Sequence, residues 1–139
     1  MRFSAGLADT LLTGIQEIDV QHQVLFDVIA RLEQAVTSAE RWSAVHFAIV
    51  ELTGFANIHF AVEEALMRLH AYPDLEAHIA QHRTFSANLA DIEAHSIRHD
   101  VSARMLAMLR DWLVNHIGGA DRAYVPHLRT APIAAKPGN

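Results

Sequence analysis

Apolar residues recur at steps of three and four along four stretches of the chain, which run over residues 18–36, 45–70, 75–92 and 101–116. This spacing is typical of one face of an α-helix. Pro73 and the pair Gly118-Gly119 interrupt the pattern, and no hairpin dipeptide stands between alternating apolar residues. The sequence therefore predicts an all-α protein, an antiparallel up-down-up-down four-helix bundle with an N-terminal arm and a short C-terminal extension.

Polar side chains occupy positions in these apolar faces where leucine or isoleucine would be expected. They are His22, His59, Glu63, His78, His82 and His116. Every predicted helix contributes at least one of them. Because burying an unpartnered polar group costs several kcal/mol and an unpaired carboxylate costs more, six such groups in one interior need one another or a cation. We therefore expect a metal site inside the bundle.

The spacing of these residues supports this interpretation. His59 and Glu63, like His78 and His82, stand four residues apart, which places both members on one helix face about 6 Å apart along the axis. The histidines at positions 95 and 99 have the same spacing, but they fall in the polar segment 92–100, which we expect to be a connection outside the apolar faces.

Asp121 is a further candidate ligand, although it follows His116 by five residues. On a regular helix this separation is a rotation of about 140°, so the two side chains would not share a site. Gly118-Gly119 lies between them and allows a π-type bulge or a broken turn. We expect such a distortion to turn Asp121 back towards the core.

Four segments resemble the hemerythrin family, particularly its bacterial members. They are Gly14-Ile15-x2-Ile18-Asp19-x-Gln21-His22-x2-Leu25, His59-Phe60-x2-Glu63-Glu64-x-Leu66-Met67, His78-x3-His82-x2-Phe85 and Trp112-Leu113-x2-His116-Ile117-x3-Asp121. The resemblance covers about residues 14 to 128, and all seven ligand positions of the family are filled in order.

The resemblance implies a non-haem di-iron centre that binds dioxygen reversibly, as a carrier, store or sensor. Carried over by position, one iron would be held by His78, His82 and His116, and the other by His22 and His59. Two carboxylates, Glu63 and Asp121, would bridge the irons together with an oxo or hydroxo group. The iron with two histidines would keep the open position for O2. The apolar residues implied around that oxygen are Leu25, Phe60, Trp112, Leu113 and Ile117.

Two other kinds of metal protein remain as alternatives. A di-iron enzyme acting on O2, peroxide or nitric oxide is one, although the chain lacks the Glu-x-x-His motif of carboxylate-rich di-iron bundles. A structural zinc site is the other, but such sites have a closed shell of four ligands. We expect His46, His70 and His127 to lie outside any site, His46 facing away from it and His127 at the surface.

Composition narrows the protein class further. The chain of 139 residues has no cysteine, which excludes disulfides and thiolate metal sites, and its net charge of −5 argues against nucleic-acid binding. The longest apolar stretch, residues 43–67, is interrupted by six polar residues, so we predict no membrane span and a cytoplasmic location. We expect one domain over residues 1–129 with its arm at 1–17, a flexible tail at 130–139, and a partner protein that consumes oxygen or transmits a signal.

Overall fold

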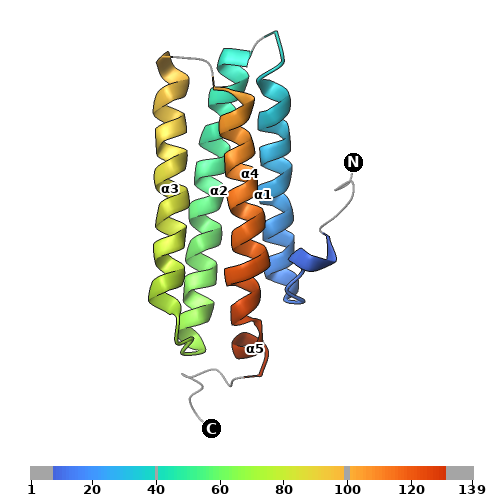
Figure 1. Cartoon of the computed structure of the whole chain (residues 1–139), viewed down its shortest axis with the longest axis vertical. Helices are drawn as coiled ribbons and strands as arrows, with labels where there is room; N and C mark the ends of the chain where they lie inside the picture. Colours follow the sequence, from blue (N-terminus) through green and yellow to red (C-terminus); the bar gives the residue numbers. More distant parts are fainter. Residues whose placement is uncertain (1–7, 40, 99–100, 131–139) are drawn as a thin grey trace.

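Four long helices lie side by side in the computed structural model, which describes residues 8–39, 41–98 and 101–130 (Figure 1). The elements in chain order are η1 (Asp9–Leu11), α1 (Gln16–Ala35), α2 (Arg41–Leu69), α3 (Leu75–Arg98), α4 (Ala103–His116), η2 (Ile117–Asp121) and α5 (Arg122–Thr130). No strand occurs among these described residues. Successive long helices run in opposite directions, so the predicted all-α antiparallel bundle is confirmed.

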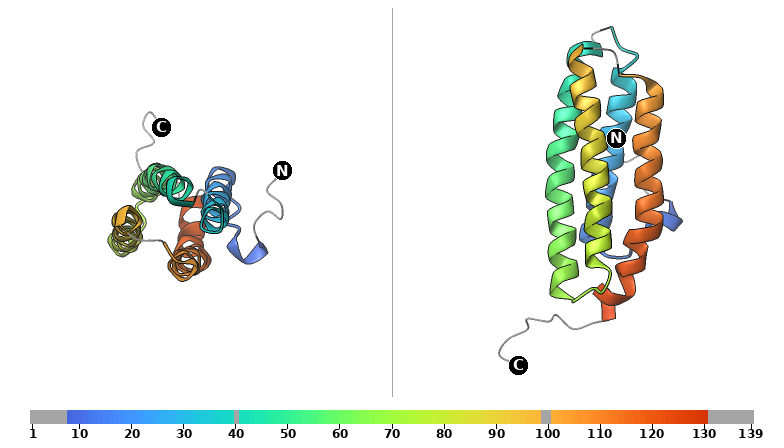
Figure 2. Two further views of the ribbon diagram at one scale, coloured as in Figure 1. Left: turned by 90° about the horizontal axis from the view of Figure 1, so that it is seen from above. Right: turned by 60° about the vertical axis from the view of Figure 1, so that its left-hand side comes forward.

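The long helices stand at the corners of a square when the bundle is seen from above (Figure 2). Each contacts the helix before and after it, and α1 also packs against α4, which closes the bundle. The π-helical segment η2 and the short α5 continue α4 at the end of the bundle where α2 passes into α3.

Apolar side chains form two separate clusters inside the bundle. The larger cluster fills most of its length and reaches Phe60 on α2 and Ile117 on η2. The smaller cluster contains Met67, Tyr72 and Tyr124 at the α5 end. The stretches between these clusters, about two helical turns of α2 and one turn of η2, are therefore shielded from water on both sides. Polar side chains placed there are buried.

The turn from α2 to α3 uses a left-handed residue that is not glycine. Ala71 has φ 54°. Its N–H donates to the carbonyl oxygen of Arg68 at 3.1 Å, and the N–H of Tyr72 donates to that of Met67 at 2.9 Å. This pair of bonds is the Schellman arrangement that closes a helix C-terminus. It directs Tyr72 into the smaller apolar cluster.

The N-terminal arm is fixed at both ends of its described part. The carboxylate of Asp19 accepts hydrogen bonds from the backbone N–H groups of Thr13 and Gly14 and from the Thr13 hydroxyl. Arg122 of α5 donates to the carbonyl oxygens of Asp9 and Leu12. The helix α1 begins at Gln16, inside the segment 1–17 predicted as arm.

Two further boundaries differ from the sequence prediction. The segment 92–100 was expected to be a connection, but α3 continues to Arg98. Ile92 and Ser96 are both buried there on one helix face, so tertiary packing outweighs the polar composition. The chain also returns to helix after Gly118-Gly119 and remains helical to Thr130. Residues 131–139 and His99 lie outside the described residues, so the flexible tail and the domain limits stay predictions.

One helix, the stretch Trp42–Leu69 of α2, is long and apolar enough to cross a membrane by length and composition alone. The same test is passed by core helices of bundles, and this helix carries the buried polar residues His59 and Glu63. The absence of a membrane span stays a prediction.

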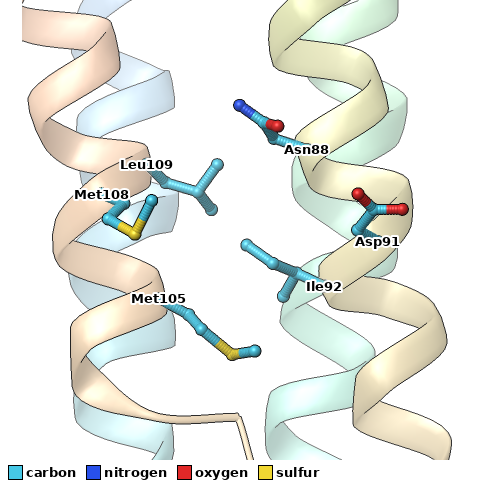
Figure 3. A pocket seen from close by; sticks show the side chains of 6 residues that line it. All are labelled: Asn88, Asp91, Ile92, Met105, Met108 and Leu109. Carbon is cyan, nitrogen blue, oxygen red and sulfur yellow. The ribbon is translucent and has the colours of Figure 1, made fainter.

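A surface pocket of about 280 Å³ opens between α3 and α4 (Figure 3). It is lined by Asn88, Asp91, Ile92, Met105, Met108 and Leu109. Its nearest lining residue on α3, Asn88, stands six residues beyond His82, about 9 Å along the helix, and none of the predicted ligands lines it. The pocket is therefore separate from the polar residues singled out by the sequence.

The turn at Ala71 generates a stability prediction. Replacing Ala71 by glycine removes the Cβ that disfavours a left-handed conformation, a strain of about 1–2 kcal/mol that greater freedom of the unfolded chain partly offsets. We expect Ala71→Gly to raise the free energy of unfolding in urea by roughly 0.5–1 kcal/mol. The control is Ala90→Gly at an exposed position within α3, which should lower it by about 1 kcal/mol. A loss of stability in Ala71→Gly would contradict this description of the turn.

Candidate metal centre

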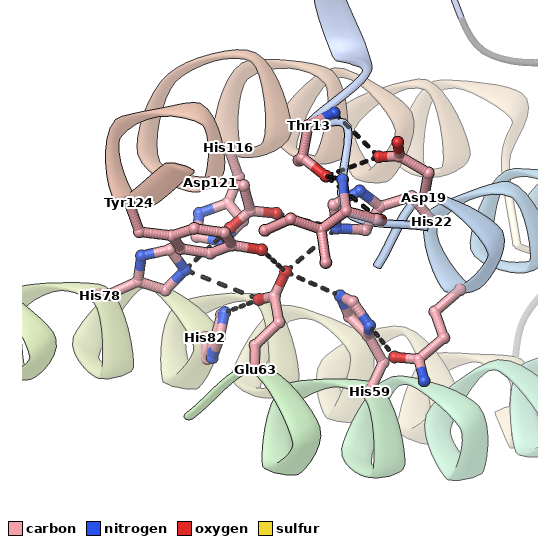
Figure 4. Close-up of polar contacts among 12 residues, drawn as sticks. Thr13, Asp19, His22, His59, Glu63, His78, His82, His116, Asp121 and Tyr124 are labelled. Atoms are coloured by element: carbon pink, nitrogen blue, oxygen red, sulfur yellow. Dashed lines mark hydrogen bonds and ion pairs between the residues drawn. The ribbon is translucent and has the colours of Figure 1, made fainter. Parts of the chain in front are cut away.

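All seven side chains predicted as ligands converge between the two apolar clusters (Figure 4). They come from four helices and the π-helical segment: His22 from α1, His59 and Glu63 from α2, His78 and His82 from α3, His116 from α4 and Asp121 from η2. None is more than 4% exposed. The bundle thus buries two carboxyl groups and five imidazoles in one place.

Glu63 lies at the centre of the group and directs its two oxygens to different histidines. Its Oε2 lies 3.1 Å from Nε2 of His22 and 3.2 Å from Nε2 of His59. Its Oε1 lies 3.1 Å from Nε2 of His82 and 3.7 Å from Nε2 of His78. One carboxylate therefore faces histidines on both sides of the site.

Asp121 also directs its two carboxylate oxygens to different histidines. Its Oδ2 lies 2.9 Å from Nε2 of His22, whereas its Oδ1 lies 2.8 Å from Nε2 of His78 and 3.1 Å from Nε2 of His116. The donor atoms consequently form two overlapping groups, in each of which all atoms lie within 4.8 Å of one another. The groups are Glu63, His78, His82, His116 and Asp121, and His22, His59, Glu63 and Asp121. Both carboxylates are shared, so the arrangement can hold two cations with two carboxylate bridges.

Many of these atoms lack the hydrogen bonds that buried polar atoms normally make. Among the described residues, no hydrogen-bond partner exists for Oε1 of Glu63, for either carboxylate oxygen of Asp121, or for Nε2 of His78, His82 and His116. Buried polar atoms are otherwise nearly always satisfied. Imidazole nitrogens and carboxylate oxygens are ligands that suit iron. These unpartnered atoms therefore fit a pair of metal ions.

Both carboxylates of the site are ionised, and they draw positive charge towards them. Burial disfavours ionised Glu63, but the hydrogen bond from His22 and the neighbouring imidazole of His59 hold its pKa well below the ordinary value. Burial and the charge of Glu63 likewise disfavour ionised Asp121, yet its histidine partners lower its pKa. Burial also opposes protonation of His22 and His78, but the two carboxylates raise the pKa of each to about 9. The carboxylates are thus anionic and attract positive charge.

Asp121 reaches the site because the helix changes its winding. Residues Ile117–Asp121 form a π-helix, and Asp121 is completely buried. The wider π turn places Asp121 on the face of His116, five residues earlier. The predicted distortion at Gly118-Gly119 is confirmed.

Three of the histidines are held from behind by residues of a neighbouring helix. Nδ1 of His59 donates to Oε1 of Gln21 at 2.7 Å, and Nδ1 of His116 donates to Oε1 of Gln81 at 2.7 Å. Nδ1 of His82 donates to Oε2 of Glu64 at 2.8 Å. Since each Nδ1 carries the proton, each Nε2 is left with a lone pair directed into the site.

The sequence analysis assigned neither Gln21 nor Gln81 to the site. Each glutamine directly precedes a predicted ligand, but its partner lies on another helix. Only the rotation of the packed helices establishes that contact.

Tyr124 is another residue that sequence reasoning missed. Its hydroxyl donates to Oε2 of Glu63 at 2.8 Å, and its ring lies 5.5 Å from that of His78. Burial and the nearby carboxylates raise its pKa, so the hydroxyl keeps its proton and remains a donor. The available signal was its position three residues after Asp121, on the same helix face.

Most of the residues predicted around the oxygen are buried in the larger apolar cluster. These are Leu25, Phe60, Leu113 and Ile117. Trp112 is only partly buried, and its ring stacks on His116 with centroids 4.6 Å apart. Phe60 stacks on His82 in the same manner at 3.9 Å. Two histidines are thus covered by aromatic rings.

The remaining described histidines belong to neither metal-binding group. Nδ1 of His70 donates to the carbonyl oxygen of Leu66 at 2.9 Å, close to the end of α2. His127, which was predicted at the surface, is partly buried, and its ring lies 4.9 Å from that of Tyr72. The helical extension α5 brings it against the smaller cluster.

Comparisons with known proteins agree with this geometry. The model of the hemerythrin HHE cation binding domain matches residues 13–128. A bacteriohemerythrin of Stenotrophomonas maltophilia is 36% identical over 122 residues, which cover 87% of this chain and 79% of that protein. A myohemerythrin of Theromyzon tessulatum is 30% identical over 84% of this chain and 87% of its own length.

A crystal structure of wild-type hemerythrin superposes with a TM-score of 0.78 and 30% identity, covering 84% of this chain and 90% of that one. The resemblance seen in the sequence motifs is therefore confirmed over nearly the whole chain. This chain belongs to the family of hemerythrin HHE cation binding domains.

Proposed function

We propose that this protein binds dioxygen reversibly at a non-haem di-iron centre. The observation that carries the proposal is the orientation of the two carboxylates. Glu63 and Asp121 each direct one oxygen to each group of histidines. The hemerythrin relatives support it. Two ferrous ions would supply the electrons and the open coordination position that dioxygen requires.

The donor sets give the two metal positions different numbers of protein ligands. His78, His82 and His116 would hold one iron together with both carboxylates. His22 and His59 would hold the other with the same carboxylates. An oxo or hydroxo bridge would complete the centre. The second position would then have one donor fewer, and we propose that it would accept dioxygen.

The surrounding residues support reversible binding over irreversible oxidation. Leu25, Phe60, Leu113 and Ile117 are at most 6% exposed and keep water from one side of the site. A site that excludes water prevents proton leakage and loss of a reactive oxygen species. Tyr124 closes the other side and holds Glu63 through a hydrogen bond. These residues favour a carrier, store or sensor, whereas the cytoplasmic location and the partner protein stay predictions.

Oxygen cycling tests the function directly. The purified protein is loaded with Fe²⁺ without oxygen, exposed to air and then returned to an oxygen-free atmosphere. We expect charge-transfer absorption to appear with oxygen and to disappear on its removal over repeated cycles. Irreversible consumption of oxygen would favour the di-iron enzyme instead, and failure to bind iron would contradict both.

Removal of single histidines tests the ligand assignment. His82→Ala deletes a nitrogen donor, so we expect iron affinity to fall by more than the roughly 10–100-fold typical for loss of an outer contact. The matched control is His46→Ala on α2, because His46 belongs to neither metal-binding group. Iron per chain is measured after dialysis against a chelator. Loss of iron in the control variant but not in His82→Ala would refute the assignment.

A further inference from the structure

Three residues of α2 lie against the ring of His82 from different directions. Phe60 stacks on its face with centroids 3.9 Å apart and planes 13° apart. Oε1 of Glu63 lies 3.1 Å from its Nε2, and Oε2 of Glu64 accepts its Nδ1–H at 2.8 Å. The ring therefore has one orientation and one tautomer.

The acceptor behind His82 differs in charge from the other two acceptors. His59 and His116 donate to the neutral amide oxygens of Gln21 and Gln81, both at 2.7 Å. Only His82, of these three, donates to a carboxylate. The Glu64 side chain is 23% exposed, so it remains partly solvated while it approaches a side chain that is 3% exposed. The site thus has an additional negative charge on one side.

A carboxylate acts on a metal ligand more strongly than an amide does. Hydrogen bonds to an ionised acceptor are about twice as strong as neutral ones. A carboxylate behind a histidine also raises the basicity of the nitrogen that binds the metal. Both effects favour a more highly charged ion at that nitrogen, since electron density and negative charge stabilise Fe³⁺ more than Fe²⁺.

Building on the proposed function, we propose that Glu64 lowers the reduction potential of the iron held by His78, His82 and His116 relative to the iron at the other position. The step concerned is Fe³⁺ + e⁻ → Fe²⁺ at that one ion. In measurements the electron comes from an electrode through a mediator, and the Nδ1 proton stays between His82 and Glu64. Glu64 is a positioning residue that makes the two metal positions electronically unequal.

The test removes the charge but keeps the hydrogen bond. In Glu64→Gln, an amide oxygen replaces the carboxylate, as already occurs at Gln21 and Gln81. We expect the ferric-to-ferrous ratio of one iron at a fixed potential to fall about tenfold, which is about 59 mV for one electron. The measurement is a potentiometric titration of iron-loaded protein, and samples are compared at equal iron content.

A compensating variant separates charge from mere packing. Gln81→Glu adds a carboxylate behind His116, which belongs to the same group of donors as His82. In the double variant Glu64→Gln/Gln81→Glu we expect the potential to return towards that of the parent. A structural role of Glu64 in joining α2 to α3 would not be restored, because Gln81 contacts α4.

The outcomes are distinct from those that test the function. A parent protein that binds oxygen reversibly but has the same potential as Glu64→Gln would overturn this inference alone. A shift that the double variant does not reverse would also overturn it. If Glu64→Gln does not retain iron, the single variant Gln81→Glu is the deciding test. It should lower the reduction potential of the parent by a similar number of millivolts. A parent that binds no iron overturns the proposed function and this inference together.

Discussion

Two carboxylates that share five imidazoles are the constraint on which the rest of the structure depends. Glu63 and Asp121 are completely buried between two apolar clusters, where an uncompensated charge would destabilise the fold. The histidines satisfy them only in part, because several nitrogen and oxygen atoms have no hydrogen-bond partner within the described chain. Two cations would compensate the carboxylates and use these atoms as ligands. Metal binding and stability of this end of the bundle are therefore linked.

The backbone adapts to bring these groups together. A regular continuation of α4 would turn Asp121 away from His116, and the π-helical winding of η2 corrects the rotation. The helix then continues as α5, which delivers Tyr124 to Glu63 and completes the smaller apolar cluster. At the other end of the chain, Arg122 ties the N-terminal arm to α5. The local departure from α-helical geometry thus serves the site directly.

Helical periodicity was sufficient for the fold and for the gathering of six of the seven donor side chains, because a polar residue in an apolar helix face must point inwards. Asp121 required the additional inference that Gly118-Gly119 distorts the helix. Side-chain contacts between different helices could not be predicted from helical periodicity. Gln81 and Tyr124 meet residues 35 and 61 positions away in the sequence, and only the rotation of the packed helices determines those meetings. The continuation of α3 to Arg98 was missed because buried Ile92 and Ser96 outweigh a polar composition.

Anomalous X-ray diffraction at the iron absorption edge, from crystals of protein loaded with Fe²⁺, tests the central claim most directly. The shared carboxylates predict two iron peaks in each chain, both next to Glu63 and Asp121. One peak should lie beside His22 and His59, and the other beside His78, His82 and His116. A single peak, or iron bound only away from these side chains, would contradict the account.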